Sequence, residues 1–302
     1  MPAVDAIADD LDAVLKDIEA LGLRARVAEL DSFGLTVVPP HQAGSPGMAL
    51  RLRDAVLRLA ERRSGIKPDV ATGASHAHLP ATAGQAGEAW LWRILQEDPV
   101  FEEALMNPVG LALMTYLLGY SAKLSSSSAL LKGPVAPASP DDPPKPLGLH
   151  SDNRGLPAPF PPFAQVAAVT WALTDYTFEN GALGYLPGSH KLCRQPTPDE
   201  SLDAVVPVEA AAGSLIVWHG NTWHAPFPRR APGLRISMLF YFCREYLTAQ
   251  ERYGTRVPAE ALARNPPRFR TLMGLADPYG WDEGGPDMAL LRASRSGRSQ
   301  YS

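Results

Sequence analysis

A His-x-Asp pair, His150 and Asp152, is followed much later in the chain by His224 and, eleven positions further on, by Arg235. Two imidazole nitrogens and one carboxylate on one face of Fe(II) leave three coordination positions open, as in non-haem iron oxygenases. An arginine just beyond the second histidine offers a guanidinium fork for the far carboxylate of 2-oxoglutarate. These residue types indicate an Fe(II) site that uses 2-oxoglutarate as cosubstrate together with dioxygen.

The positions of these residues in predicted strands make the metal site geometrically reasonable. In a strand, residues two apart point to the same face, so His150 and Asp152 can both aim into a barrel while Ser151 points away. A second predicted strand, 214–218, comes shortly before His224. His219 lies close enough to His224 to compete with it as the third ligand.

A predicted strand at 234–242 carries the candidate carboxylate anchor. One of its faces is fully apolar, and the other carries Arg235, Ser237, Leu239 and Tyr241. An arginine and a serine on one strand face predict a polar pocket, in which the guanidinium binds a carboxylate and the hydroxyl adds a hydrogen bond. Arg229 and Arg230, in a proline-flanked turn, are the alternative anchors.

The elements expected around these residues change in character near Gly119. The first third is mainly helical, with a short β-like run at 33–38. Its helices are expected at 4–18, 48–63, 88–96 and 101–118, and a further helix is expected at 259–264. After Gly119, short runs of β-branched and aromatic residues between prolines and glycines indicate an antiparallel barrel or sandwich. The expected strands are 122–132, 148–152, 165–174, 183–186, 214–218 and 234–242.

The 302 residues are expected to form a single elaborated domain. Its parts would be a mainly helical N-terminal elaboration at 1–120, a β core with the metal site at 121–244 and a C-terminal extension at 245–302, frayed at its end. A net charge of −4 offers no general attraction for nucleic acid. The chain shows no signal peptide and no long apolar run, so we expect a cytoplasmic protein without a membrane segment. Cys193 and Cys243 are too few for a disulfide framework.

Several strings in the chain resemble the phytanoyl-CoA dioxygenase family over roughly residues 29 to 244. The most specific are N-G-A-L at 180–183 and P-G-S-H-K at 187–191, because iron chemistry in general requires neither. The other matching positions are Phe33-Gly34-Leu35, His150-Ser151-Asp152, Trp171, Gly213-Ser214-Leu215, His219-Gly220, His224 and Arg235.

This resemblance implies a mainly β fold with α additions, built on a double-stranded β-helix of the jelly-roll, cupin-like kind. It also implies Fe(II) and 2-oxoglutarate, with His150, Asp152 and His224 as metal ligands and Arg235 as the cosubstrate anchor. Trp171 would line the same pocket. The interval from His224 to Arg235 fits the family and favours His224 over His219.

The expected activity is hydroxylation of an unactivated C–H bond of a small or medium-sized organic molecule, with release of succinate and CO2. Asn153 and Arg154 follow the metal motif and are candidate substrate contacts. Trp90, Trp92 and Phe160 are candidates for an apolar wall of the pocket, although we expect Trp90 and Trp92 to be helix-packing residues. His76 and His78 are interpreted as loop residues near the pocket entrance, and His190 as a turn residue. The alternatives are a non-oxidative, cupin-like barrel that binds a metal or small ligand, and a purely structural β-sandwich.

Overall fold

Two antiparallel sheets form the centre of the chain. The computed structural model describes residues 11–44, 47–74, 87–136, 145–276, 281, 283–286 and 288. The larger sheet has the strand order β1 (Leu35–Val38), β7 (Leu215–His219), β4 (Val166–Ala172), β9 (Arg235–Cys243), β3 (Lys123–Lys132) and β2 (Glu88–Trp92). The smaller sheet has the order β6 (Val206–Pro207), β5 (Leu183–Tyr185) and β8 (His224–Pro226).

Strand β9 runs through the large sheet between β4 and β3, and its register decides what faces the interior. Arg235 lies opposite Lys132 of β3, and Ser237 lies opposite Leu130 of β3 and Ala172 of β4. Residues that pair across strands share a face. The face that carries Arg235 therefore extends over β3, β9 and β4 and faces the small sheet.

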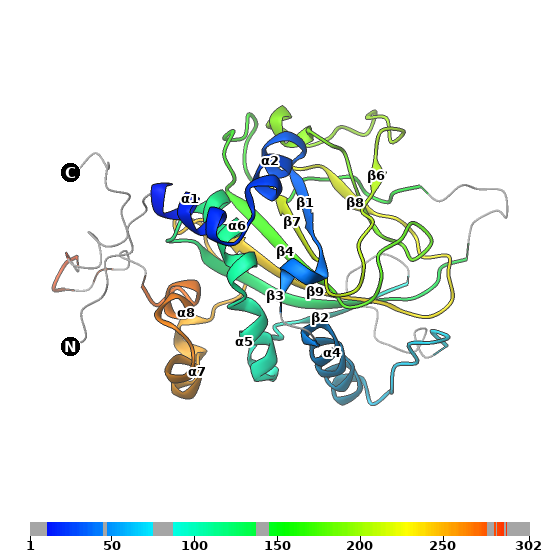
Figure 1. Cartoon of the computed structure of the whole chain (residues 1–302), viewed down its shortest axis with the longest axis horizontal. Helices are drawn as coiled ribbons and strands as arrows, with labels where there is room; N and C mark the ends of the chain where they lie inside the picture. Colours follow the sequence, from blue (N-terminus) through cyan, green and yellow to red (C-terminus); the bar gives the residue numbers. More distant parts are fainter. Residues whose placement is uncertain are drawn as a thin grey trace.

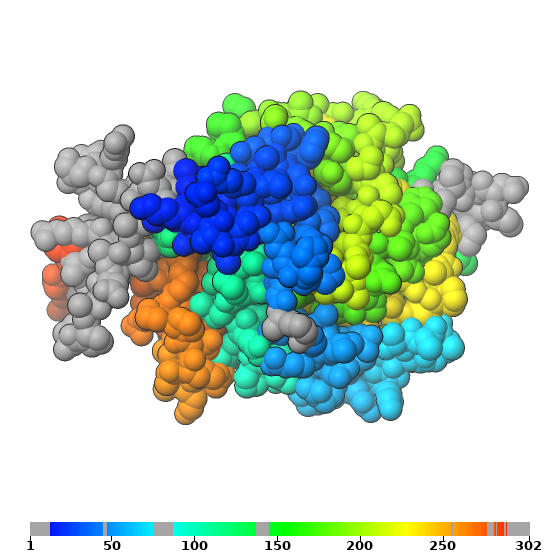
Figure 2. Space-filling model, in the orientation of Figure 1, coloured from blue at the N-terminus to red at the C-terminus, as the bar shows by residue number. Residues whose placement is uncertain are grey.

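The opposite face of the large sheet is covered by helices, as Figure 1 shows. These helices are α1 (Leu11–Ala20), α2 (Arg24–Phe33), α3 (Pro40–Ala43), α4 (Met48–Ser64), α5 (Pro99–Leu105), α6 (Pro108–Leu118), α7 (Ala259–Arg264) and α8 (Pro267–Leu272). The side chains of Ile236, Met238 and Phe240 on β9 pack in the main hydrophobic core with this helical layer. In Figure 2 the N-terminal helices (dark blue) and the helices α7 and α8 (orange) adjoin the green and yellow segments that contain most of the strands.

Most expected elements are present with shifted ends, but the helix expected at 88–96 is wrong. This segment forms strand β2 and a short 3-10 helix, Leu95–Glu97, and β2 pairs with β3 from Glu88↔Lys132 to Trp92↔Ser128. Glu88, Trp90 and Trp92 alternate with Ala89 and Leu91, which is a period of two. The pairing with β3 decides in favour of the strand, because so short an apolar run fits either structure.

The single helix expected at 101–118 is two helices, α5 and α6. The break lies at Asn107, where Pro108 follows; a proline disfavours helical backbone in the residue before it. The Asn107 side chain accepts a hydrogen bond from Gly110 N at 2.9 Å and so caps α6. The helix α2 was not expected, and the strand expected at 148–152 is reduced to an isolated bridge at His150.

Some expectations fall on residues outside the described part of the chain. These include residues 4–10 of the expected opening helix, the loop residues His76 and His78, and much of the proline-rich segment 133–146. Within the described residues, no helix is long and apolar enough to cross a lipid bilayer.

Candidate metal centre and its pocket

His150, Asp152 and His224 converge in space. One ligand atom from each lies within 4.8 Å of the others. The convergence follows from backbone pairing, because His150 N and His224 O are 3.1 Å apart and His224 N and His150 O are 2.8 Å apart. Asp152 N donates to Gly220 O at 2.9 Å, which fixes the second residue of the pair. The strand β8 thus aligns a distant histidine with the His-x-Asp segment.

Both histidines are oriented by hydrogen bonds from their Nδ1 atoms. His150 Nδ1 donates to Gly148 O at 2.7 Å, and His224 Nδ1 donates to Thr222 O at 2.9 Å. A carbonyl oxygen only accepts, so each Nδ1 carries a proton and each Nε2 is the ring nitrogen that can face a metal ion. Burial, reinforced by the neighbouring His224, lowers the pKa of His150 and keeps that imidazole neutral. The Nε2 atoms of His150 and His224 are therefore the candidate metal-binding atoms.

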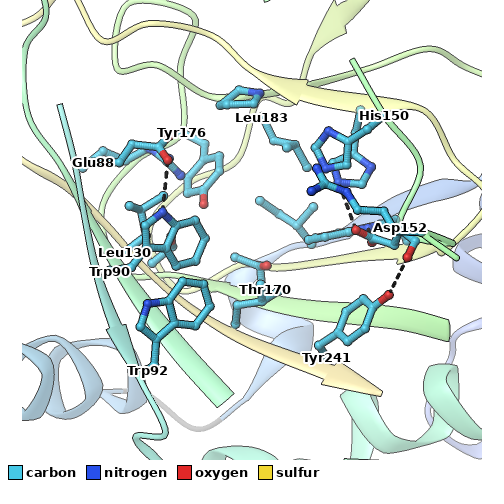
Figure 3. A pocket seen from close by; sticks show the side chains of 18 residues that line it. Glu88, Trp90, Trp92, Leu130, His150, Asp152, Thr170, Tyr176, Leu183 and Tyr241 are labelled. Atoms are coloured by element: carbon cyan, nitrogen blue, oxygen red, sulfur yellow. Dashed lines mark hydrogen bonds and ion pairs between the residues drawn. The ribbon is translucent and has the colours of Figure 1, made fainter. Parts of the chain in front are cut away.

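The carboxylate of Asp152 is held by a hydrogen bond from outside the triad. Trp218 Nε1 donates to Asp152 Oδ2 at 2.8 Å, while Oδ1 lies 3.6 Å from His224 Nε2. Tyr241 donates from its hydroxyl to the backbone oxygen of Asp152 at 3.0 Å, as drawn in Figure 3. Such outer contacts fix the direction of a ligand and are typical of metal sites. One carboxylate oxygen therefore remains available to an ion.

His219 does not join this group. Its Nδ1 accepts from Asn221 N at 3.0 Å, and its ring packs against His190 with centroids 5.4 Å apart. Burial lowers the pKa of His219 to about 3, so the ring is neutral and embedded in the protein. His190 is also buried, and its Nε2 lies 3.3 Å from Asp31 O. The geometry favours His224 as the third ligand and gives His190 and His219 structural positions.

A buried guanidinium lies in the same cavity as the triad. Arg235 is 3% exposed, and its Cζ lies 4.3 Å from the centroid of the Tyr176 ring. Among the described residues, its buried Nε has no hydrogen-bond partner and no carboxylate forms an ion pair with the guanidinium. A buried charge is costly unless it is paired. The arrangement fits an anionic ligand, and Ser237 on the same strand face offers a hydroxyl beside it.

A second buried cation adjoins Arg235. Lys132 Nζ lies 3.1 Å from Glu88 Oε1, and both side chains are almost fully buried. Burial, reinforced by the charge of Arg235, lowers the pKa of Lys132 to about 8. Glu88 also accepts a hydrogen bond from Trp90 Nε1 at 3.1 Å. With Lys132 protonated, two cations and one carboxylate leave one net positive charge at this end of the cavity.

The alternative anchors are engaged elsewhere. Arg229 Nε donates to Gly233 O at 2.8 Å, and its Nη1 donates to Asn180 Oδ1 at 3.0 Å. Arg230 Nη1 donates to Val135 O at 3.0 Å. Neither residue lines the cavity of the triad, and both tie loops together.

The expectation that Trp171 lines the pocket is wrong. Trp171 does not line the pocket but is almost completely buried in the helical core, where a Cβ on Gly44 would lie 2.9 Å from its Cη2. The reason is strand parity, because Thr170 of β4 faces the cavity and its neighbour must face the helices. Any contact between Trp171 and a cosubstrate in this cavity is therefore excluded.

Two adjoining cavities meet at the triad. The first, of about 420 Å³, is lined by the three candidate ligands together with Arg235 and Ser237. The second, of about 500 Å³, shares His150 and Asp152 but not Arg235. Asn153 lines the second cavity, where it is buried and hydrogen-bonded to Asn221, and the exposed Arg154 lines both.

Several residues that shape the site were not predicted from the sequence. Tyr241 lies on the face of the strand 234–242 that was expected to form the pocket, so alternation contained this signal. No face was assigned to the strand that carries Trp218. Tyr176 and the Glu88–Lys132 pair had no local signal, because they are brought together across strands far apart in the sequence. For Trp90 and Trp92 we favoured helix packing over a pocket wall, but both residues line both cavities.

The sequence is similar to a protein family and to known dioxygenases. A model described as phytanoyl-CoA dioxygenase (PhyH) matches residues 8–237. The chain is 31% identical to Dioxygenase af480 from Aspergillus fumigatus over 59% of this chain and 56% of that protein. It therefore spans little more than half the length of this relative.

Solved structures show the same fold. HygX from Streptomyces hygroscopicus, with nickel and 2-oxoglutarate bound, has a TM-score of 0.55 at 16% identity, covering 75% of this chain and 88% of HygX. The carbocyclase SnoK from nogalamycin biosynthesis also has a TM-score of 0.55, at 20% identity, covering 81% of this chain and 91% of SnoK. With the two antiparallel sheets, these matches confirm the expected double-stranded β-helix with helical additions.

Proposed function

The chain belongs to the phytanoyl-CoA dioxygenase family of Fe(II)- and 2-oxoglutarate-dependent oxygenases, and from this premise we propose that it hydroxylates an unactivated C–H bond. The substrate would be a small or medium-sized organic molecule, and the coproducts would be succinate and CO2. The observation that carries the proposal is one cavity holding both the His150, Asp152 and His224 group and the buried, unpaired Arg235.

The donor set suits Fe(II). Two imidazole Nε2 atoms and one carboxylate oxygen form the two-histidine, one-carboxylate set of non-haem iron oxygenases. Iron bound there supplies the oxidation chemistry with dioxygen and 2-oxoglutarate. Trp218 keeps Asp152 Oδ2 occupied, so that Oδ1 remains for the metal.

The protein's own task is binding and placement. Arg235 would hold the far carboxylate of 2-oxoglutarate, with Ser237 donating a hydrogen bond beside it. Leu130 and Ile216 line the same cavity and exclude water from the reacting groups. No general base is required, so the accuracy with which the substrate C–H bond is placed decides the outcome.

Asp152 also bears on the type of reaction. Iron halogenases of similar fold have a small residue in place of the carboxylate, so a carboxylate at this position disfavours halogenation. Solved structures of this fold include an epimerase and a carbocyclase, both from nogalamycin biosynthesis. Hydroxylation is the outcome we propose. The alternative of a non-oxidative, metal-binding barrel gives no role to a buried, unpaired Arg235.

An anaerobic spectrum tests the proposal. Adding 2-oxoglutarate to the Fe(II)-loaded protein should produce a weak visible charge-transfer band, and Asp152→Ala should abolish it. Asp203→Ala, at an exposed loop position, serves as the matched control and should keep the band. A folded, iron-loaded wild-type protein without the band would contradict the proposal. Screening a metabolite library for substrate-dependent succinate release would then identify the reaction.

A further inference from the structure

Two stacked indoles form one wall of the pocket. Trp90 and Trp92 have ring centroids 5.0 Å apart and an interplanar angle of 10°. Together with Glu88 they occupy the inward face of β2, opposite His150 and Asp152 in Figure 3. Trp92 remains 43% exposed although it is one of the largest apolar side chains. An exposed indole beside a metal site is a ready surface for a flat apolar molecule.

The two indoles also line the second cavity. Trp90 and Trp92 line both cavities, as do the candidate ligands His150 and Asp152, but Arg235 lines only the first. When 2-oxoglutarate occupies the Arg235 end, the second cavity remains open on the other side. Its far part is polar, because Ser126 and Ser128 of β3 and Gln250 line it. A substrate there would lie against the indoles and reach the metal ligands.

The charges around the two cavities favour an anion over a cation. Arg154 lines both, is exposed, and has no hydrogen bond or ion pair with any described residue. Of the described carboxylates, only Glu88 and Asp152 line either cavity. Glu88 is paired with Lys132, and Asp152 belongs to the metal group. No lining carboxylate is left to receive an ammonium group.

We propose that the substrate is a flat, largely apolar ring compound that carries one anionic group. Its ring would lie against Trp92 and Trp90, and its anionic group would bind Arg154. This assignment rests on the proposed function and defines the substrate class for the same site. A polycationic sugar such as hygromycin B, which is bound in a solved structure of HygX, would bring several positive charges to Arg154, so the proposal predicts weaker binding of such a sugar.

Calorimetry with 2-naphthoate tests the assignment. The anaerobic protein, loaded with Fe(II) and saturated with 2-oxoglutarate, should bind 2-naphthoate. Trp92→Ala should weaken this binding at least tenfold, and Trp92→Phe should recover most of it. Trp281→Ala, which removes another exposed indole that lines neither cavity, should leave it unchanged.

The charge contact is tested separately. Arg154→Gln should weaken binding of 2-naphthoate at least fivefold but leave the neutral analogue 2-naphthylmethanol unchanged. Arg24→Gln, at an exposed position on α2 outside both cavities, is the control and should change neither.

The outcomes separate the two proposals. If the loaded protein shows the charge-transfer band but does not bind 2-naphthoate at millimolar concentration, the substrate assignment fails alone. The same holds if hygromycin B binds more tightly than 2-naphthoate, or if Trp92→Ala and Trp281→Ala have equal effects. If the band is absent from the iron-loaded protein, the proposed function itself fails.

Discussion

Trp218 Nε1 donates to Asp152 Oδ2 at 2.8 Å, and this contact decides which carboxylate oxygen turns toward His224. We expect Trp218→Phe to keep most of the ring packing but to release the carboxylate. Loss of such an outer contact weakens metal affinity by about 10- to 100-fold. Titration of the apoprotein with Fe(II) or Co(II) measures the change.

Trp171→Phe is the matched control for this prediction. Trp171 is buried in the helical core, and its Nε1 has no hydrogen-bond partner among the residues that the structure describes. We expect its substitution to leave metal affinity and the 2-oxoglutarate requirement unchanged. Equal losses of metal affinity in the two variants would show that general packing, rather than the bond to Asp152, is responsible.

Arg235→Ala should raise the 2-oxoglutarate concentration needed for half-maximal turnover at least tenfold. The reason is the loss of a charge-assisted contact, which contributes about 1.5–3 kcal/mol. Initial rates of succinate formation measure the effect. Arg230→Ala removes a guanidinium that donates to Val135 O and does not line the cavity of the triad, and it should leave the requirement unchanged. If Arg235→Ala leaves the 2-oxoglutarate requirement unchanged, another cationic residue must bind the far carboxylate of 2-oxoglutarate.

The affinity for 2-oxoglutarate should fall as the pH rises through about 8. In the folded protein, burial and the charge of Arg235 lower the pKa of Lys132 to about 8 from its ordinary 10.5. Above this pH Lys132 is neutral, and the charges of Arg235 and Glu88 cancel. Losing one nearby positive charge should weaken binding on the order of tenfold. Calorimetric titrations with 2-oxoglutarate between pH 7 and pH 9.5 measure this dependence.

The double variant Glu88→Gln, Lys132→Met tests the cause. It removes one charge of each sign. Arg235 then gives this end of the cavity one net positive charge throughout the range from pH 7 to pH 9.5. We expect the pH dependence to disappear while binding at pH 7 changes little. Persistence of the full pH dependence in the double variant would exclude Lys132 as its source.

Lys132 should also affect stability with a defined sign. Its pKa is lower in the folded than in the unfolded chain, so the unfolded chain binds more protons between about pH 8 and pH 10.5. The contribution of Lys132 to stability therefore increases as the pH rises through this window. Lys132→Met alone should destabilise the protein by about 3–5 kcal/mol, since it leaves Glu88 buried and unpaired. Denaturant unfolding measures both effects.

Gly220→Ala should disturb the metal group without changing any candidate ligand. A Cβ at this position would overlap the carbonyl oxygen of Val166, so the backbone must move. Gly220 O accepts the hydrogen bond from Asp152 N at 2.9 Å, and the shift is passed to the carboxylate. We expect a loss of about 1–3 kcal/mol in unfolding free energy and weaker Fe(II) binding.

Gly254→Ala is the control for Gly220→Ala, because a Cβ there would meet no atom within 4 Å. Its unfolding free energy and Fe(II) affinity should match those of the wild type. A Gly220→Ala variant with wild-type Fe(II) affinity would show that the backbone adjusts without moving Asp152.

The sequence by itself determined the features that depend on local alternation. The His-x-Asp spacing correctly predicted that His150 and Asp152 lie at one centre, although the strand expected around them is reduced to a bridge at His150. Arg235 and Ser237 share the inward face of β9, as the period of two requires. The helices at 48–63 and 259–264 were likewise predictable, because their patterns are local. These properties need no knowledge of distant parts of the chain.

Only the tertiary structure decided which strands lie beside one another. It chose His224 over His219 by pairing β8 with the His-x-Asp segment, and it joined Glu88 to Lys132 across β2 and β3. It also turned Trp171 away from the pocket. The physical reason is that alternation groups residues by face, whereas the burial of the whole chain decides which face points inward and which neighbour it meets.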